Sequence, residues 1–168
     1  MTDRERADAV YAALLTRQGE QWVQPRVERT RRVLELLDDP QKTYRVIHVT
    51  GTNGKTSVSH LLEGILTQIG AVTGLSSTAE RHIAGQVIVS RLTTPEAYEM
   101  HALLALMRER GVEAVAVEVS AQALSRRRVD GMMFDVAGFT NLSHDHLDDY
   151  ADMAEYFQAK LPLFRPDR

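Results

Sequence analysis

Gly51-Thr52-Asn53-Gly54-Lys55-Thr56-Ser57 is the most informative segment of this chain of 168 residues. A continuous apolar run at Tyr44–Val49 precedes the segment and is typical of a buried strand. Apolar residues at helical spacing follow it and end at Gly70, a common residue just past a helix terminus. The segment is therefore expected to be a glycine-rich loop between a strand and a long helix.

A loop of this composition and placement is suited to phosphate. Glycines allow backbone N–H groups to surround phosphate oxygens, and a helix N-terminus adds a favourable dipole. In a phosphate-binding loop, Lys55 would contact the β- and γ-phosphates and the Thr56 hydroxyl would hold magnesium. The general loop pattern expects glycine at position 49, where this chain has Val49, so only the shorter Gly-x-x-Gly-Lys-Thr form is present. An ordinary glycine turn is the alternative.

The rest of the chain predicts strands that alternate with helices, which favours an α/β fold with an open, mostly parallel sheet flanked by helices. Ligands of such sheets bind beyond the carboxyl ends of the strands. We expect two segments, a helical one over residues 1–40 and a partial α/β domain with the phosphate loop over 41–168. The expected elements are helices at 6–17, 25–38, 58–69 and 95–110, strands at 44–49, 71–78, 114–119 and 134–139, and a hairpin within 81–92.

Composition excludes several classes of function. The chain has no cysteine, so disulfides and thiolate metal sites are ruled out. A net charge of −3 gives no electrostatic reason to expect nucleic acid as a partner. No apolar run approaches the roughly 20 residues of a membrane span, and the charged N-terminus does not resemble a secretory signal. A cytoplasmic protein is expected.

Polar residues follow two later strands. Glu118 ends the strand at 114–119, where a carboxylate can coordinate magnesium between phosphates, although a strand-end glutamate that faces water is the alternative. The strand at 134–139 leads into Asn141-Leu142-Ser143-His144-Asp145-His146-Leu147-Asp148. Within it, His144-x-His146-x-Asp148 also resembles a zinc-hydrolase motif, but that motif expects histidine at position 149, where Asp149 stands. A solvated loop with no ligand role is a further interpretation of this segment.

Several segments resemble the Mur ligase family, which includes the cell-wall ligases and folylpolyglutamate synthase. Thr50–Thr56 is similar to its ATP-binding loop. Glu118-Val119-Ser120 resembles the Glu-Val-Ser-Ser-His stretch of UDP-N-acetylmuramoyl-tripeptide synthetases, in which the glutamate binds magnesium. The chain departs from this stretch at Ala121 and Gln122, positions that lie near the muramoyl substrate in that group.

The resemblance also implies roles for residues further along the chain. The segment that starts at Asn141 is similar to the family motif Asn-Leu-x-x-Asp-His-Leu-Asp. Asn141 and Asp145 would then line the nucleotide site, and His146 would bind a second magnesium ion. Lys160 matches the lysine that reacts with CO₂ to form a carbamate, an anionic ligand for the metals, whereas a helix-surface lysine is the alternative. Substrate-binding residues would be Thr93, Thr94, Pro95 and Ser120.

The activity implied is an ATP- and Mg²⁺-dependent ligase that joins an amino acid to a UDP-N-acetylmuramoyl-peptide through an acyl phosphate. The segment Pro25–Thr30 resembles folylpolyglutamate synthase instead, so a ligase of folate and glutamate is an alternative. A non-catalytic ATP-binding fragment is another. The family has further strands and a C-terminal domain that binds the amino acid, and neither is expected within these 168 residues. The expected partners are therefore small molecules and that missing domain.

Overall fold

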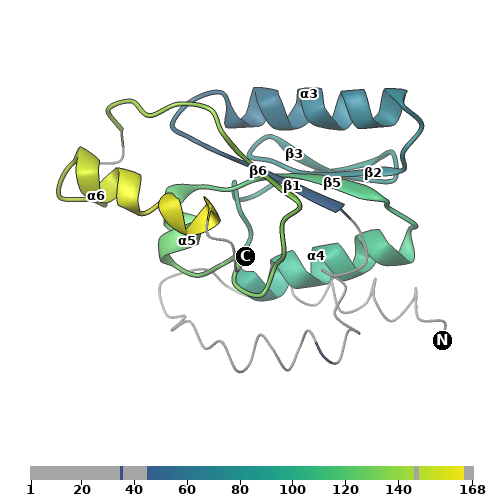
Figure 1. Cartoon of the computed structure of the whole chain (residues 1–168). Coiled ribbons are helices and arrows are strands. Elements are labelled where there is room, and N and C mark those ends of the chain that lie inside the picture. The colour runs from purple at the N-terminus through teal and green to yellow at the C-terminus, as the bar shows by residue number, and fades with distance from the viewer. Residues whose placement is uncertain (1–34, 36–44, 146–147, 165–168) are drawn as a thin grey trace.

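The computed structural model describes residues 35, 45–145 and 148–164 (Figure 1). The helices expected at 6–17 and 25–38 lie outside the described residues, apart from position 35, which is helical. The first described strand is β1 (Arg45–Thr50), and the chain then alternates between strands and helices as the sequence predicts.

A six-stranded sheet forms the centre of the molecule, in the order β4-β3-β2-β5-β1-β6. Its strands β2 (Thr73–Ser76), β5 (Ala114–Glu118), β1 and β6 (Val136–Phe139) run parallel. The hairpin expected within 81–92 is confirmed as β3 (Glu80–Ile83) and β4 (Gln86–Val89), which extend the sheet antiparallel beyond β2. The prediction of an open, mostly parallel sheet is therefore confirmed.

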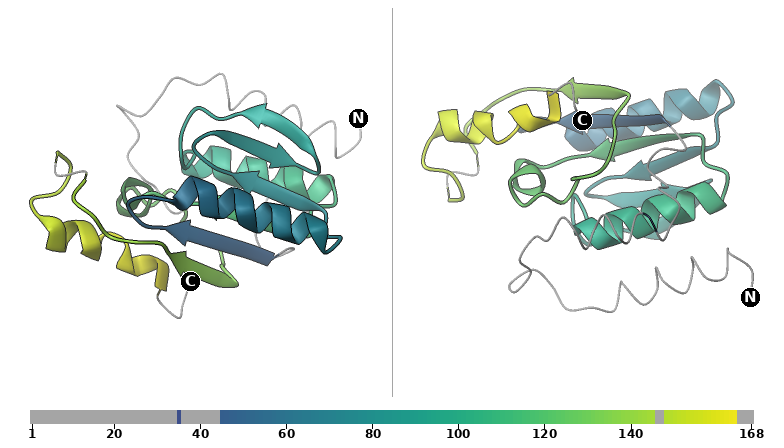
Figure 2. Two further views of the ribbon diagram at one scale, coloured as in Figure 1. Left: turned by 90° about the horizontal axis from the view of Figure 1, so that it is seen from above. Right: turned by 60° about the horizontal axis from the view of Figure 1, so that its bottom comes forward.

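Helices cover both faces of this sheet (Figures 1 and 2). The helix after the glycine loop, α3 (Lys55–Gln68), lies on one face, and α4 (Ala97–Glu109) lies on the other. Three short helices come later in the chain: α5 (Ala121–Ser125), α6 (Met153–Gln158) and the 3₁₀ turn η3 (Leu161–Phe164). None of the described helices is long and apolar enough to cross a membrane.

The main core lies between the sheet and α4. Leu103, Leu104 and Met107 of α4 belong to the same buried cluster as Val115 and Val117 of β5. The sequence predicts one apolar face for this helix, whereas every residue from 100 to 107 is buried. The run His-Ala-Leu-Leu-Ala-Leu explains the difference, because a helix that is apolar on all sides can be covered on all sides.

Helix α3 is less buried than its apolar residues predict. Leu61, Ile65 and Ile69 share one face and are 66%, 59% and 75% exposed. Ser59 is the one buried residue of this helix. The inner face of α3 is rich in polar side chains, and these side chains meet the sheet near the glycine loop.

The parallel strands β2, β5, β1 and β6 all end at the same edge of the sheet. The glycine loop and the segment that starts at Thr140 follow β1 and β6 at this edge, and Glu118 is the last residue of β5. The helices α5 and α6 also lie at this edge (Figure 1). The fold therefore brings together the polar motifs that the sequence places after separate strands.

Candidate functional site

The glycine loop depends on two unusual backbone positions. Gly51 has a φ of 145°, and a Cβ there would lie 1.9 Å from Thr140 Oγ1 and 3.0 Å from the Asn141 nitrogen. Gly54 has a φ of 79° at the N-cap of α3, with open space where a Cβ would be. Both positions favour glycine, Gly51 because of close approach and Gly54 because of its left-handed conformation.

The segment after β6 holds this loop in place. The Thr52 N–H donates to the Asn141 carbonyl oxygen at 2.9 Å, and the Asn53 N–H donates to Asn141 Oδ1 at 3.0 Å. Thr140 Oγ1 donates to the Asn53 carbonyl oxygen at 2.7 Å. The Ser143 N–H donates to Thr52 Oγ1 at 3.0 Å. Asn141, predicted to line the nucleotide site, thus contacts the loop directly.

Glu118, the predicted magnesium ligand, ends β5, and its carboxylate lies next to the start of α3. Its side chain is 2% exposed, and its Oε2 accepts hydrogen bonds from Thr56 Oγ1 at 3.0 Å and from the Thr78 N–H at 2.8 Å. Thr78 Oγ1 donates to Glu118 Oε1 at 3.0 Å. Carboxylate and hydroxyl oxygens are hard donors that suit Mg²⁺. The pair of Glu118 and Thr56 therefore fits a magnesium ion next to the loop.

Two lysines contact the backbone of the same loop. Lys55 Nζ donates to the Thr52 carbonyl oxygen at 3.0 Å, and Lys160 Nζ donates to the Gly51 carbonyl oxygen at 3.0 Å. Lys160 is 1% exposed, and its Nζ lies 4.2 Å from the centre of the Tyr156 ring. The alternative of a helix-surface lysine is therefore wrong, because Lys160 lies just after α6 and points into the protein.

Burial, and to a smaller extent the charge of Lys55, lowers the pKa of Lys160 to about 8, while the charge of Asp145 acts in the opposite direction. Burial also raises the pKa of Tyr156, whose hydroxyl oxygen lies 3.3 Å from Thr52 Oγ1. A lysine with this pKa has a substantial neutral fraction near physiological pH. The neutral amine is the form that can act as a nucleophile.

The residues predicted to bind substrate lie beside Glu118. Thr94 is fully buried, and its Oγ1 donates to the Glu118 carbonyl oxygen and accepts from the Ser120 N–H, both at 3.1 Å. Ser120 Oγ accepts from the Ala123 N–H and caps α5. Thr93 Oγ1 lies 2.9 Å from Thr78 Oγ1. The hydroxyls of Thr94 and Ser120 thus position backbone here, and their contact with substrate stays a prediction.

Four predicted residues complete the set. Ser57 is exposed on the first turn of α3, and Asp145 is exposed on the loop after β6. Pro95 is buried just before α4. His146 lies outside the described residues, so both its proposed metal role and the rival zinc motif stay predictions.

Sequence reasoning missed Thr78, which makes two of the three hydrogen bonds to the Glu118 carboxylate described above. Its place in the sequence held a usable signal, because Thr78 ends the run 71–78, and a polar residue beyond a parallel strand is a candidate ligand. Nothing in the sequence predicted the contacts made by Thr140, Ser143 and Tyr156, because each contact depends on how the segment after β6 packs.

The fold and this cluster define the chain as an α/β protein with a glycine-rich loop at the carboxyl edge of its sheet. The family model "Mur ligase middle domain" matches residues 49–167. The chain belongs to the Mur ligase family.

Curated relatives are similar over much of this chain. It is 72% identical over 120 residues to a UDP-N-acetylmuramyl-tripeptide synthetase of Leifsonia xyli subsp. xyli, which covers 71% of this chain and 23% of that protein. It is 50% identical over 132 residues to a UDP-N-acetylmuramoyl-L-alanyl-D-glutamate–2,6-diaminopimelate ligase of Corynebacterium glutamicum, covering 79% of this chain and 26% of the relative. The chain thus spans about a quarter of the length of these relatives.

Solved structures agree with the fold. A UDP-N-acetylmuramoyl-L-alanyl-D-glutamate–2,6-diaminopimelate ligase matches with a TM-score of 0.70 and 27% identity, over 96% of this chain and 36% of that one. The folylpolyglutamate synthase of Mycobacterium tuberculosis, solved with ADP, matches with a TM-score of 0.72 and 22% identity, over 99% of this chain and 44% of that one. At that identity the second match supports the fold alone.

Proposed function

We propose that this chain binds ATP with magnesium and forms the nucleotide-binding part of an amide ligase that activates a carboxylate as an acyl phosphate. The observation that carries the proposal is the contact between Thr56 and Glu118 at the start of α3. This contact places a hydroxyl and a buried carboxylate next to a loop whose backbone can surround phosphates. Bound magnesium would supply positive charge to the phosphates at these two residues.

The two lysines have separate proposed roles. Lys55 Nζ would exchange the Thr52 carbonyl oxygen for phosphate oxygens and stabilise charge that develops during phosphoryl transfer. Lys160, whose pKa is lowered to about 8, would react as a neutral amine with CO₂, and loss of a proton would leave a carbamate. The carbamate would give the buried site an anionic oxygen ligand in place of a cation. Asp145 would line the nucleotide site, and His146 would bind a second magnesium ion.

The proposed acceptor is a UDP-N-acetylmuramoyl-peptide, because the relative that is 72% identical is named as a synthetase of UDP-N-acetylmuramyl-tripeptide, the product of such a ligation. Thr93, Thr94, Pro95 and Ser120 would face the acceptor. The amine of an amino acid would attack the acyl phosphate, and phosphate would leave. A ligase of folate and glutamate is the second candidate, supported by the fold shared with folylpolyglutamate synthase.

A chimera tests the ligase proposal. Residues 49–164 of this chain would replace the matching segment of the Leifsonia xyli synthetase, and mass spectrometry would follow addition of amino acids to UDP-N-acetylmuramoyl-L-alanyl-D-glutamate. We expect an ATP-dependent product that Lys55→Ala reduces by roughly 10²–10³-fold, the usual cost of removing one electrostatic contact to a transition state.

A parallel reaction with a folate acceptor and glutamate would identify the second candidate. A folded chimera that binds ATP but joins no amino acid to either acceptor would contradict the ligase proposal. That result would favour a non-catalytic nucleotide-binding role.

A further inference from the structure

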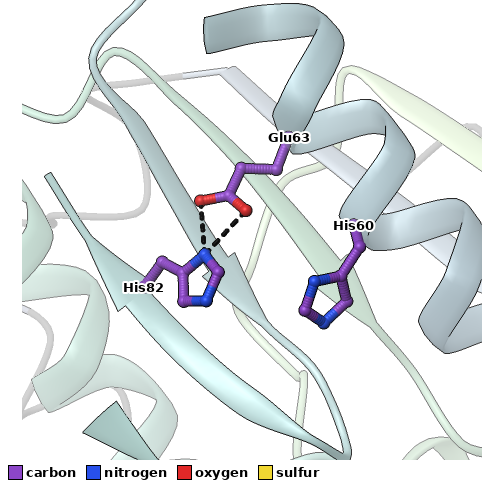
Figure 3. Close-up of side chains that lie close together, drawn as sticks. All are labelled: His60, Glu63 and His82. Carbon is purple, nitrogen blue, oxygen red and sulfur yellow. Dashed lines mark hydrogen bonds and ion pairs between the residues drawn. The ribbon is translucent and has the colours of Figure 1, made fainter. Parts of the chain in front are cut away.

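We propose that His60, Glu63 and His82 form a binding site for a divalent transition metal of the zinc class, separate from the nucleotide site. His60 and Glu63 belong to the inner face of α3, and His82 comes from β3. One ligand atom from each side chain lies within 4.8 Å of the other two (Figure 3). The site would join the helix that follows the glycine loop to the hairpin at the edge of the sheet.

The fold produces this convergence from simple spacing. His60 and Glu63 are three residues apart, so both project from the same face of α3. Along β3, Arg81 and Ile83 are buried on one face, while His82 projects from the other face toward α3 (Figure 3). His82 Nδ1 lies 2.8 Å and 2.7 Å from the two carboxylate oxygens of Glu63.

The remaining distances need only a small adjustment. Zinc binds histidine nitrogen and carboxylate oxygen at about 2.0–2.2 Å, so tetrahedral ligand atoms lie roughly 3.4 Å apart. The ligand atoms lie within 4.8 Å of one another, so any of them would have to move by at most about 1.4 Å, which side-chain rotation in His60 can supply. The rings of His60 and His82 are perpendicular, with centroids 5.6 Å apart, which is an edge-to-face contact.

Neighbouring groups contact all three ligands. His82 Nε2 lies 3.1 Å from Glu80 Oε1, an ion-pair contact without hydrogen-bond geometry, while Nδ1 faces Glu63. His60 Nε2 lies 3.2 Å from Ser77 Oγ, which leaves its Nδ1 as the coordinating atom. Thr73 Oγ1 donates to Glu63 Oε1 at 3.5 Å. Carboxylates and hydroxyls that hold the second nitrogen of a histidine are typical partners of metal-binding imidazoles.

A simple ion pair between Glu63 and His82 is the competing interpretation. An ion pair explains the short distances of those two side chains and leaves the His60 ring with its contacts to Ser77 and His82, whereas a metal would use all three side chains at one point. Two imidazoles and one carboxylate are the donors of many zinc sites and leave a fourth position for water. Magnesium prefers oxygen donors, so this set discriminates against the ion expected at Glu118. The side chains of His82 and Glu63 are 17% and 13% exposed, so the site is sheltered but reachable.

The site lies close to the nucleotide-binding cluster without sharing a ligand with it. His60 lies one helical turn after Thr56, and its partner Ser77 precedes Thr78 in the chain. Thr56 and Thr78 both bind Glu118. A metal at His60 would therefore fix α3 against β3 and steady the end of β2, where Thr78 contacts the predicted magnesium ligand.

Titration of the chelator-treated 168-residue chain with Zn²⁺, and absorption spectra with Co²⁺, test the proposal. We expect one equivalent of either metal, with the visible bands of a tetrahedral Co²⁺ site, and a higher Tm with Zn²⁺. The double variant His60→Gln/His82→Gln should lose this binding. Glu80→Gln, which removes the ion-pair partner of His82, should weaken zinc binding by about 10- to 100-fold.

The control variant is His144→Gln, which alters the rival zinc motif and leaves the three ligands intact. It should bind zinc as the unmodified chain does. Unchanged zinc binding by the double variant, or loss of binding in His144→Gln, would overturn the proposal. Far-UV circular dichroism of each metal-free variant, together with the separate variant Glu63→Gln, distinguishes loss of a ligand from loss of folding. No zinc binding by the folded, unmodified chain would also refute it.

Discussion

At the scale of single residues, Lys160 shows how tertiary structure changes the chemistry of a side chain. On sequence alone it is one of three lysines among 20 basic residues. In the folded chain it is buried, lies over the Tyr156 ring and donates to the Gly51 carbonyl oxygen 109 residues earlier. Burial and the nearby charge of Lys55 together favour the neutral amine.

This lowered pKa predicts a pH-dependent modification. At a fixed concentration of dissolved CO₂, the neutral fraction of Lys160 should rise as pH increases through about 8, and carbamate formation should rise with it. An ordinary lysine, with a pKa near 10.4, stays protonated over the same range. ¹³C NMR of the chain with labelled bicarbonate should show a carbamate signal that grows between pH 7 and pH 8.5.

Two matched variants identify the modified residue. Lys160→Arg keeps a positive charge but cannot form this carbamate, so the signal should disappear. Lys42→Arg should keep the signal. A carbamate signal that persists in Lys160→Arg would contradict the assignment.

At the scale of elements, two glycines of the loop allow the cost of lost close packing to be measured separately from the cost of a strained backbone conformation. Gly51→Ala would place a Cβ 1.9 Å from Thr140 Oγ1 and close to the Asn141 backbone, so the loop must shift. Gly54→Ala meets no neighbour and costs only the left-handed conformation, about 1–2 kcal/mol.

Urea unfolding should therefore show a larger loss of free energy for Gly51→Ala than for Gly54→Ala. Hydrogen exchange should show weaker protection of the Thr52 and Asn53 amides in Gly51→Ala, because both amides bond to Asn141. Equal stability of the two variants would contradict the close approach between the loop and the segment after β6.

Element positions could be predicted from sequence better than element environments. The apolar runs predicted β1, β2, β5 and β6, and the glycine between Ile83 and Val87 predicted the hairpin. Burial was harder, since periodicity describes one helix and not its neighbours. The exposed Leu61 and Ile65 of α3 fit the helical pattern as well as buried residues do. The contacts of Thr78 likewise depend on strand order, which places β2 beside β5.

At the scale of the whole molecule, strand order determines where the site lies. The chain runs from β1 through α3 to β2, and later inserts β5 between these two strands. This order places Glu118 of β5 between the glycine loop after β1 and Thr78 after β2. Sequence motifs predicted that Thr56 and Glu118 belong to the site. The topology explains why these two residues, 62 positions apart in the chain, meet at 3.0 Å.

The same order leaves β6 at an edge of the sheet, where Val136 is 53% exposed and Phe139 is 39% exposed. Within the described residues, β6 is thus paired on one side only, with β1.

The chain matches about a quarter of the length of its curated relatives. Because the chain matches only that share of its relatives, nucleotide binding is the activity that can be tested on it most directly.

Calorimetric titration of the purified chain with a non-hydrolysable ATP analogue, with and without magnesium, tests the central claim. We expect binding that magnesium strengthens, that Lys55→Ala removes, and that Glu118→Gln makes independent of magnesium. Lys42→Arg is the control and should bind as the unmodified chain does. Failure of the folded chain to bind the analogue, or binding that neither magnesium nor Lys55→Ala changes, would contradict the assignment of this loop as a nucleotide site.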